Sequence, residues 1–377
     1  MELKIGIAEL SKALGRSQGI VEKKSTMPIL SHVLLEAKKG GGLVVSATDL
    51  DIAVSSEHPC EVVKEGAVAV SARHLYDIVR ALPEAEVTLR RAQNNYLEVK
   101  SGPSEFKIVG LPAEDFPTLP RFEKVPFTDV QAGTLLEMIE RTFMAVSNDE
   151  TRYNLNGVYF EPSAEALRLV ATDGHRLSMS EKPLQGGFGL KRGVILPKKG
   201  LAELRKLLSE VAEAGAEEGA GDTKLGFVEN SAILRRPGVV LSMRLIEGLF
   251  PDYKQVIPKT GDKVVSVGRD RLLETLRRIS ILSTDKAHAV KLELAKGHLR
   301  VTSQNPDLGE AKEEVPVEYD GDALKIGFNA RYILDVLAVL RSKDVKLELA
   351  DDLSPGVVKG GDEVDQGFTA VVMPMRI

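Results

Sequence analysis

The chain contains 377 residues, of which 43% are hydrophobic, 28% charged and 5% aromatic, and its net charge is −5. This length predicts two or three domains, and the composition is that of an ordinary globular protein. No apolar run is long enough for a membrane span, and the start MELKIGIAEL does not resemble a secretory signal. Cys60 is the single cysteine, so no internal disulfide or thiolate metal site is expected. Together these features favour a cytoplasmic protein.

Six amphipathic helices are expected along the chain, each after a short apolar strand and before further strands. Leu75, Ile78, Val79 and Leu82 illustrate the helical spacing of apolar side chains. The expected helices span residues 8–18, 71–82, 132–144, 197–209, 269–280 and 329–342. The acidic, glycine-rich insertion near 212–222 predicts a mobile loop. Because the strands lack long parallel crossovers, we predict mainly antiparallel sheets and an α+β fold.

The strand–helix–strands unit recurs six times, which predicts three similar domains of two units each. The segments LVVSATDLDIAV and LRLVATDGHRLSM match around a shared Ala-Thr-Asp. Each repeat of about 60 residues exceeds the usual period of solenoid proteins. Proline and glycine interrupt the periodicity at two places, and the predicted domains therefore span 1–122, 128–252 and 260–377.

The net negative charge argues against a nucleic-acid partner only if charge is spread evenly. The six helical windows hold 15 Lys and Arg against 8 Asp and Glu, a net charge of +7, which leaves −12 for the rest. Helices that share one face of an assembly would make that face positive and attract a phosphate backbone without reading bases. Alternatively, helix faces are basic without any such role.

Five segments in order, ETRYNLNGVYFE, LVATDGHRLSM, FPDYKQVIP, NARYILDVL and VVMPMRI, carry a resemblance to a known family. Over its whole length the chain resembles the beta subunit of bacterial DNA polymerase III, the sliding clamp family. The resemblance implies three DNA-clamp domains per chain and two chains head to tail in a closed ring. It also implies a non-catalytic processivity factor that encircles double-stranded DNA and needs no cofactor or metal. The implied partners are polymerases, the clamp loader, and repair and ligation enzymes.

The resemblance also implies a pocket that receives short apolar peptides from these partners. Its residues here would be Leu155, Thr172, Gly174, His175, Arg176, Leu177, Pro251, Val256, Asn329, Tyr332, Leu353, Ser354, Val371, Val372, Met373, Pro374, Met375, Arg376 and Ile377. Two positions depart from the family pattern. Gln255 stands where a second basic residue is frequent, and Ile377 replaces a frequent terminal Leu. Both departures would shift partner preference and leave the pocket in place.

For DNA and for the ring seam the resemblance implies two further sets of residues. The DNA-binding set would be Lys24, Arg73, Tyr153, Lys198 and Lys199. The dimer interface would join His74, Phe106 and Ile108 to Ile281 and Leu282, beside the acidic Glu310, Glu313 and Glu314.

Two other functions remain open from the residues alone. Asp173 and His175 in TDGHR would be the acid/base or metal-binding pair of a DNA-acting hydrolase, although the histidines show no ligand spacing. A monomeric peptide-binding scaffold is the third reading.

Three smaller motifs favour structural roles. Thr48 to Asp51 resembles a metal-binding DxD but repeats the position of TDGH, which predicts a turn at the end of a strand. The run Gly40 to Gly42 predicts a hairpin turn, and no phosphate-binding loop motif occurs. Cys60 is expected to be a small buried residue.

Overall fold

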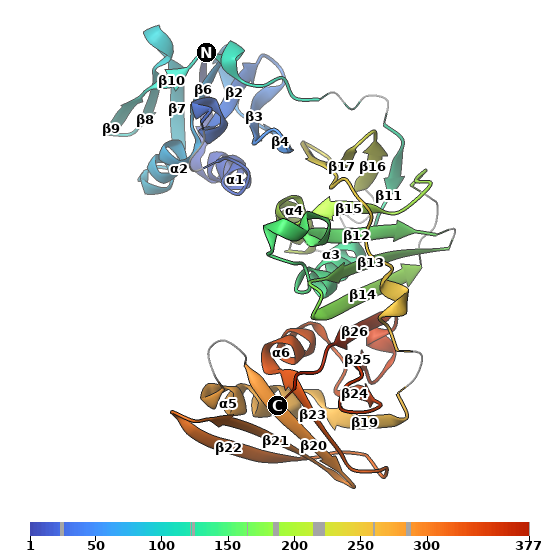
Figure 1. Ribbon diagram of the computed structural model, residues 1–377. Coiled ribbons are helices and arrows are strands. Elements are labelled where there is room, and N and C mark those ends of the chain that lie inside the picture. The colour runs from blue at the N-terminus through green and yellow to red at the C-terminus, as the bar shows by residue number, and fades with distance from the viewer. Residues whose placement is uncertain are drawn as a thin grey trace. The chain divides into compact units, whose positions relative to one another are not determined.

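The computed structural model describes residues 1–22, 26–120, 122, 125–163, 165–183, 188–213, 223–258, 261–283 and 288–376 (Figure 1). Lys24, Ile377 and residues 214–222 of the acidic insertion lie outside the described residues. The chain divides into two compact units. The first comprises residues 1–135, 188–190 and 199–245, and the second comprises 136–187, 191–198 and 246–377.

All six predicted helices are present. They are α1 (Ile7–Ser17), α2 (Ala72–Ala81), α3 (Ala132–Phe143), α4 (Lys198–Glu213), α5 (Arg269–Ile279) and α6 (Ala330–Val339). Helix α4 runs four residues beyond the predicted end at 209, so the start of the expected mobile loop is helical instead. The reason is that Val211 is buried and continues the apolar stripe of Leu204, Leu207 and Leu208.

Two sheets build the first unit. The five-stranded sheet has the order β5 (Glu61–Lys64), β1 (Glu2–Gly6), β7 (Glu86–Arg91), β8 (Leu97–Ser101), β9 (Ser104–Ile108). The nine-stranded sheet has the order β10 (Gly110–Leu111), β6 (Gly66–Ser71), β2 (His32–Lys38), β3 (Gly42–Thr48), β4 (Ile52–His58), β18 (Val239–Arg244), β17 (Ser231–Arg236), β16 (Lys224–Val228), β11 (Phe127–Asp129).

Two further sheets build the second unit. The eight-stranded sheet has the order β15 (Val194–Pro197), β12 (Gly157–Pro162), β13 (Ala166–Thr172), β14 (Arg176–Pro183), β26 (Phe368–Val372), β25 (Gly356–Gly360), β24 (Asp344–Leu349), β19 (Lys263–Gly268). The four-stranded sheet has the order β22 (Gly309–Pro316), β21 (His298–Asn305), β20 (Ala289–Ala295), β23 (Leu324–Asn329).

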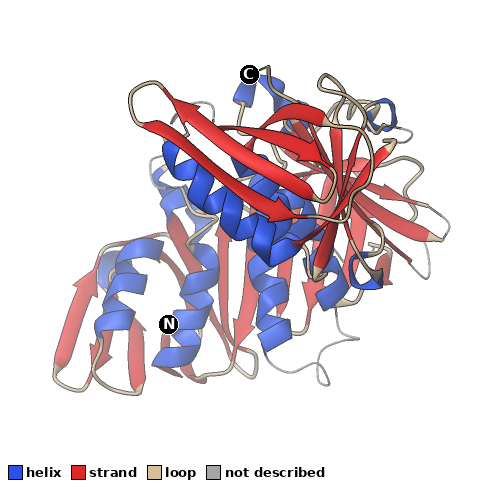
Figure 2. Cartoon of the chain, turned by 90° about the horizontal axis from the view of Figure 1, so that it is seen from below, coloured by secondary structure: helices blue, strands red, loops and turns tan. Residues whose placement is uncertain are grey.

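Strands dominate the chain, as Figure 2 shows in red against the blue helices. Every strand pairing among the described residues is antiparallel, which confirms the predicted α+β class. The hairpin predicted at Gly40 to Gly42 joins β2 to β3, and Gly40 and Gly42 take φ angles of 77° and 76°. Such left-handed angles favour glycine because it has no side chain to clash.

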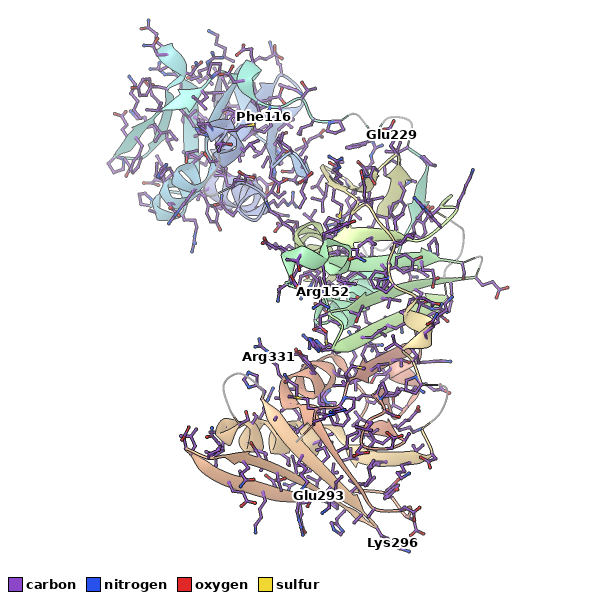
Figure 3. The ribbon with its side chains drawn as sticks, in the orientation of Figure 1. Phe116, Arg152, Glu229, Glu293, Lys296 and Arg331 are labelled. Carbon is purple, nitrogen blue, oxygen red and sulfur yellow. The ribbon has the colours of Figure 1, made fainter. Side chains whose placement is uncertain are left out.

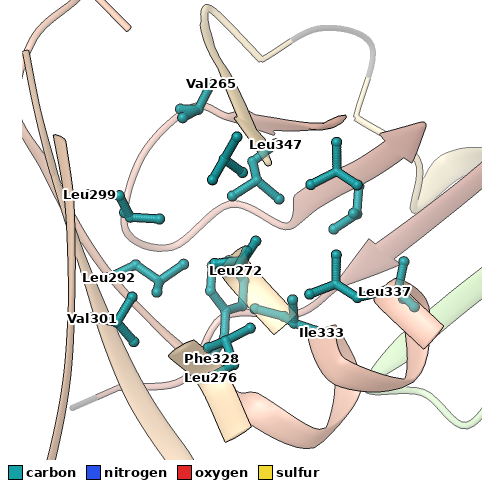
Figure 4. Packing of buried hydrophobic residues seen from close by; sticks show 14 of the residues in the cluster. Val265, Leu272, Leu276, Leu292, Leu299, Val301, Phe328, Ile333, Leu337 and Leu347 are labelled. Atoms are coloured by element: carbon teal, nitrogen blue, oxygen red, sulfur yellow. The ribbon is translucent and has the colours of Figure 1, made fainter. Parts of the chain in front are cut away.

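The helices of the second unit pack apolar stripes onto its sheets. Leu272 and Leu276 from α5 and Ile333 from α6 lie in one cluster of buried side chains with strand residues such as Leu292 and Val301 (Figure 4). The cluster contains residues of both sheets of that unit, among them Leu347 of β24 and Val372 of β26. The last strand of the chain is therefore part of a hydrophobic core.

The two large sheets cross the boundaries predicted from the sequence. Strand β4, from the first predicted domain, pairs with β18, from the second. Likewise β14 of the second predicted domain pairs with β26 of the third. Packing therefore divides the chain into two compact units, whereas the repeats in the sequence predict three domains. The exact domain boundaries stay a prediction.

Candidate functional site

The turn between β13 and β14 is held by its own side chains. The Thr172 hydroxyl donates to the carbonyl of Arg176 at 2.6 Å and accepts from the Gly174 N–H at 3.1 Å. Asp173 Oδ1 accepts from the N–H groups of His175 at 2.9 Å and Arg176 at 3.0 Å. Gly174 has a φ of 88°, in the left-handed region. The motif TDGHR is thus a rigid turn at the end of a strand.

The apolar tail of the chain lies beside this turn. In the register of β14 and β26, Arg176 is opposite Val372 and Leu177 is opposite Val371. Beyond β26, the Met373 N–H donates to the His175 carbonyl at 2.9 Å, and the Met375 N–H donates to the Gly327 carbonyl at 2.8 Å. These backbone bonds fix the tail, and they explain why so apolar a segment stays in place at a chain end, where termini are usually loose.

Arg176 joins the turn to helix α6. Its guanidinium contacts Asp173 at 3.1 Å and Asp335 at 2.6 Å, and it lies over the Tyr332 ring, 4.5 Å from the centroid. Burial, together with the nearby Asp173 charge, raises the pKa of Tyr332. Asn329 caps α6 by accepting from the Arg331 N–H at 2.9 Å. Four predicted site residues, Arg176, Asn329, Tyr332 and His175, are therefore positioned on neighbouring elements.

An apolar base underlies part of the site. Leu177 and Val371 are buried in one cluster with Val170, Val357 and Tyr253. Phe250 and Ile257, from the segment that leads to the last part of the chain, pack against the same cluster. Tyr159 and Phe250 stack with ring centroids 4.9 Å apart. The predicted site residues Leu177 and Val371 therefore lie beneath the site and are themselves almost fully buried.

Three large apolar side chains of the predicted site remain exposed. The exposed fractions are 65% for Leu353, 42% for Val256 and 38% for Met373. The loop of Leu353 is firm, because Asp351 Oδ1 accepts from the Leu353 N–H at 2.9 Å and from the Ser354 N–H at 2.6 Å. These bonds lower the pKa of Asp351. Exposed apolar groups on a fixed backbone suit the binding of an apolar peptide.

The remaining predicted site residues vary in exposure. Pro251 and Arg376 are exposed, and Pro374 and Met375 are partly buried. Leu155 is buried at the end of the 3₁₀ helix η4 (Glu150–Leu155), where its carbonyl accepts from the Ser147 N–H at 3.1 Å. Ile377 lies outside the described residues.

Sequence reasoning missed two residues that shape this site. Asp335 anchors Arg176, and its position three residues after Tyr332 on the same helix face was the available signal. Arg152 is the second (labelled in Figure 3). A Cβ at Gly174 would lie 2.8 Å from its Nη1 atom, so the end of the Arg152 side chain would have to move, whereas the positive φ is what favours glycine. No local pattern in the sequence links residues 152 and 174.

The predicted DNA-binding residues differ in how available they are. Arg73 is exposed, and its one ion pair with a described residue is a long contact of 3.8 Å with Asp77. Tyr153 is 59% exposed. Lys198 donates to Asn148 and lies 5.7 Å from the Phe143 ring centroid, and burial lowers its pKa, with a further contribution from Arg176. Lys199 is bound to Asp49 and to the Ile20 carbonyl.

The positive charge of the helices is smaller in effect than its count suggests. Arg141 of α3 is buried against Asp365 and so presents no charge to a ligand. Arg278 pairs with Glu313, and Arg16 with Glu210. The net count of the helices therefore overstates the charge available to DNA.

The residues predicted at the ring seam lie on an edge strand, on helix α2 and on the 3₁₀ helix that follows α5. Phe106 is 40% exposed on β9, the last strand of its sheet. Ile281, in the 3₁₀ helix η6 (Ser280–Leu282), is 74% exposed, and Leu282 is partly buried. His74 is exposed and Ile108 partly buried. Glu313 pairs with Arg278 and Arg271, and Glu314 pairs with Arg300, so part of the acidic cluster is neutralised within the chain.

The Thr48 to Asp51 motif has the predicted structural role, whereas the prediction for Cys60 needs a correction. Thr48 and Asp49 hold a turn like that of Thr172 and Asp173, with Asp49 Oδ1 accepting from the Ile52 N–H at 2.6 Å. Cys60 is half-buried, so the prediction of a buried residue was wrong; it follows Pro59 between β4 and β5. Partial burial raises the pKa of its thiol.

Two properties of the described residues bear on other functions. No group of three or more His, Cys, Asp or Glu side chains there is arranged to hold a metal ion. Within the same residues, no helix has the length and apolar character needed to cross a bilayer.

Comparisons with known proteins match the whole chain. Residues 1–120, 129–252 and 254–376 match the models of the N-terminal, central and C-terminal domains of the DNA polymerase III beta subunit. The chain is 38% identical to the beta sliding clamp of Caulobacter vibrioides over 384 residues, covering 100% of both chains.

Solved structures of sliding clamps also resemble the chain over its whole length. A sliding clamp from Bartonella birtlesii bound to griselimycin is 36% identical with a TM-score of 0.92, covering 100% of both chains. The C. crescentus beta sliding clamp with PEG bound to its putative beta-motif tethering region is 36% identical with a TM-score of 0.91, covering 100% of this chain and 99% of that one.

Proposed function

The chain belongs to the DNA polymerase III beta subunit family, and from that membership we propose that it is the sliding clamp of a bacterial replicative polymerase. It acts without catalysing a reaction. Two copies close into a ring around double-stranded DNA in the cytoplasm, and the ring keeps the polymerase on its template.

The observation that carries the partner-binding half of this proposal is the tail of the chain. The Met373 N–H donates to the His175 carbonyl beside a turn that the side chains of Thr172 and Asp173 hold rigid. Exposed Met373, Val256 and Leu353 supply apolar surface for an extended peptide. Each Leu or Phe anchor of such a peptide contributes about 1.5–3 kcal/mol on burial. Flexible methionine side chains suit a site shared by several partners.

The partners are those of a clamp: the polymerase subunit that synthesises DNA, other polymerases, the clamp loader, and repair and ligation enzymes. A short apolar motif is enough for all of them, because the fixed backbone offers one groove edge and the side chains offer adaptable surface. Asp173, the residue of the hydrolase reading, has both oxygens occupied by the turn and by Arg176. No observation therefore favours the hydrolase.

The ring seam is proposed to join the first and last parts of two chains. Strands β9 and β22 each stand at the end of their sheet, and a strand with one open edge can pair with another chain. Phe106 and Ile281 add exposed apolar surface near those elements. The arrangement is head to tail because the two contributing surfaces belong to different parts of the chain.

The first test compares circular with linear DNA. Protein loaded by a clamp loader onto nicked circular DNA should remain bound at a salt concentration that removes ordinary phosphate-binding proteins. Cutting the circle should release it, because the link is topological. Equal retention on both forms would contradict encirclement. Sedimentation of the free protein should give about twice 41.0 kDa, and a single-chain particle would favour the monomeric scaffold.

The second test addresses the peptide site. Removal of residues 373–377 should abolish binding of a Leu/Phe-bearing partner peptide, measured by fluorescence anisotropy, and leave the dimer intact. Val264→Ala is the matched control, since Val264 is an exposed apolar residue of β19 outside the site. Unchanged peptide affinity in the truncated protein would contradict the assignment.

A further inference from the structure

The first unit repeats the backbone of the candidate peptide site in a different sheet. Strands β3, β4 and β18 correspond to β13, β14 and β26, because their registers match pair by pair. Ala53 is opposite Ser242 as Leu177 is opposite Val371, and Ser46 is opposite Ser55 as Val170 is opposite Met179. The Arg244 N–H donates to the Asp51 carbonyl at 2.8 Å, as Met373 does to His175.

Side chains on the outer face differ sharply between the two places. In the second unit Val170, Leu177 and Val371 form the cluster that Phe250 and Tyr253 cover. At the matching positions of the first unit the residues are Ser46, Ala53 and Ser242. The smaller side chains leave a cavity of about 640 Å³ between this sheet and the segment that begins at Phe116 (labelled in Figure 3). That volume falls in the range of ligand pockets.

The charges differ in the same way. In the second unit Arg168 stands between Glu161 and Glu181 on neighbouring strands and binds both, at 2.9 Å and 2.6 Å. The Tyr253 hydroxyl completes the group by donating to Glu161 at 2.6 Å and accepting from Arg168 at 2.9 Å. These bonds raise the pKa of Arg168 although burial alone would lower it.

In the first unit the arginine of this group is replaced. The same register places Val44 between Glu36 and Glu57. Both glutamates line the cavity, and neither has an ion pair with any described residue. Leu119 follows Phe116-Pro117 where Tyr253 follows Phe250-Pro251, so the phenol is missing as well. The first unit therefore keeps two carboxylates and a hollow where the second has a guanidinium and an aromatic ring.

We propose that this groove binds an extended segment of a partner protein in which one residue separates an arginine from a tyrosine, so that both side chains point to the same face. The arginine bridges Glu36 and Glu57, and the tyrosine ring occupies the space above Ser46 and Ala53. Charge complementarity identifies the occupant, and the second unit shows that one guanidinium spans two glutamates in this register. The proposal concerns a separate surface and does not depend on the proposed function.

Two cations also line the groove, and they limit what it accepts. Lys38 lies two residues beyond Glu36 on β2, and Arg235 lies opposite Val240 on β17. Both are exposed, and neither pairs with Glu36 or Glu57 within 4.0 Å among the described residues. They flank the carboxylates along the strand and across the sheet. Because they repel further positive charge, the groove should bind a segment with a single arginine more tightly than one with several consecutive basic residues.

The test uses a fluorescein-labelled, end-capped peptide, Gly-Ser-Tyr-Ser-Arg-Ser-Gly (the Tyr-Arg peptide), titrated with the full-length protein and followed by anisotropy. The double variant Glu36→Gln, Glu57→Gln should weaken binding by about tenfold or more, since it removes two charge-assisted hydrogen bonds to the arginine. Peptides with Gln in place of Arg, or Ala in place of Tyr, should bind the wild-type protein as weakly as the original peptide binds the double variant. No measurable binding to wild-type protein, or equal binding by the double variant, overturns the proposal.

Val44→Arg is the sharper variant, because it installs the guanidinium that the second unit has at this position. It should abolish binding of the Tyr-Arg peptide and leave binding of a Leu/Phe-bearing peptide at the tail unchanged. Circular dichroism melting confirms that the variant folds, and the Glu36→Gln, Glu57→Gln variant carries the test if it does not. Retained binding in a folded Val44→Arg protein overturns the proposal.

One more variant separates a partner from the chain itself. Arg121 and Lys124 lie outside the described residues and near the groove in sequence. The double variant Arg121→Gln, Lys124→Gln should bind the Tyr-Arg peptide with unchanged affinity. A tenfold gain would mean that the chain's own segment fills the groove, and it would overturn the assignment to a partner.

Discussion

The guanidinium of Arg141 lies against the carboxylate of Asp365, with 2.5 Å between Nη2 and Oδ1, and at most 1% of either side chain is exposed. Arg141 comes from α3 and Asp365 from the 3₁₀ helix η7 (Glu363–Asp365), 224 residues away in sequence. Asp365 also accepts from the N–H and hydroxyl groups of Ser342. The pair thus ties together remote segments of the second unit.

Arg141→Met should destabilise the protein by about 3–5 kcal/mol, because it leaves a buried carboxylate without its cation. Asp365→Asn should cost a similar amount, and the two changes together should cost less than their sum. Urea unfolding monitored by circular dichroism measures all three. Arg341→Gln is the control, since Arg341 is 60% exposed where it pairs with Glu137, and its removal should cost under about 1 kcal/mol. Additive effects for the buried pair would contradict the coupling.

Gly174→Ala should destabilise the turn and weaken partner-peptide binding several-fold. Its φ of 88° strains any residue with a Cβ by about 1–2 kcal/mol, and the added atom would lie 2.8 Å from Arg152. Gly40→Ala isolates the first effect, because φ is 77° there and an added Cβ meets nothing within 4 Å. If both variants bind the peptide like wild type, the Gly174 turn does not shape the site.

Arg73→Gln should reduce the salt dependence of DNA binding more than Lys199→Gln does. Arg73 is exposed with one long contact, whereas Lys199 is bound to Asp49 and to the Ile20 carbonyl. Removing one bond between a cation and a phosphate lowers the slope of log K against log salt by about 1. Short linear duplexes at low salt give this slope without topological linkage. A larger effect for Lys199→Gln would reverse the proposed roles.

The free energy of unfolding should decrease as the pH is lowered, because His58 takes up a proton more readily in the unfolded chain. Its Nδ1 lies 2.6 Å from Glu9 and its Nε2 2.8 Å from Ser56, and burial lowers its pKa below the ordinary 6.5 in spite of Glu9. The unfolded chain therefore takes up the proton first. The contribution of this group is complete above pH 6.5 and decreases as pH falls below that value toward the lower folded pKa. His58→Gln should flatten this part of the curve of unfolding free energy against pH, measured by urea titration. An unchanged curve would show that His58 does not titrate on unfolding.

Local patterns were enough to predict the helices and the turns. Apolar spacing located all six helices, and the end of α4 was missed only because Val211 extends the stripe into an acidic segment. The pairing of Thr172 and Asp173 within one turn is also local. Resemblance to a family supplied the residues of the peptide site, and the structure shows how Arg176, Tyr332 and Met373 are held there.

Long-range pairing could not be predicted from the sequence. Arg141 was counted among the basic residues of the helices, and tertiary packing buries it against Asp365. Lys199 was predicted to bind DNA, but its ammonium group is bound to Asp49, 150 residues away in sequence. Such pairs depend on tertiary packing of segments with no shared local signal, and the same holds for Asp335 and Arg152.

The pairing of β4 with β18 limits how this protein can be dissected. A fragment ending at residue 122 would carry β4 with one row of its backbone N–H and C=O groups bare, since their partners on β18 would be gone. Bare rows of this kind recruit strands from other molecules and lead to aggregation. Producing the first repeat pair as a soluble piece would therefore require a graft that supplies residues 239–244, or charged substitutions along the open side of β4.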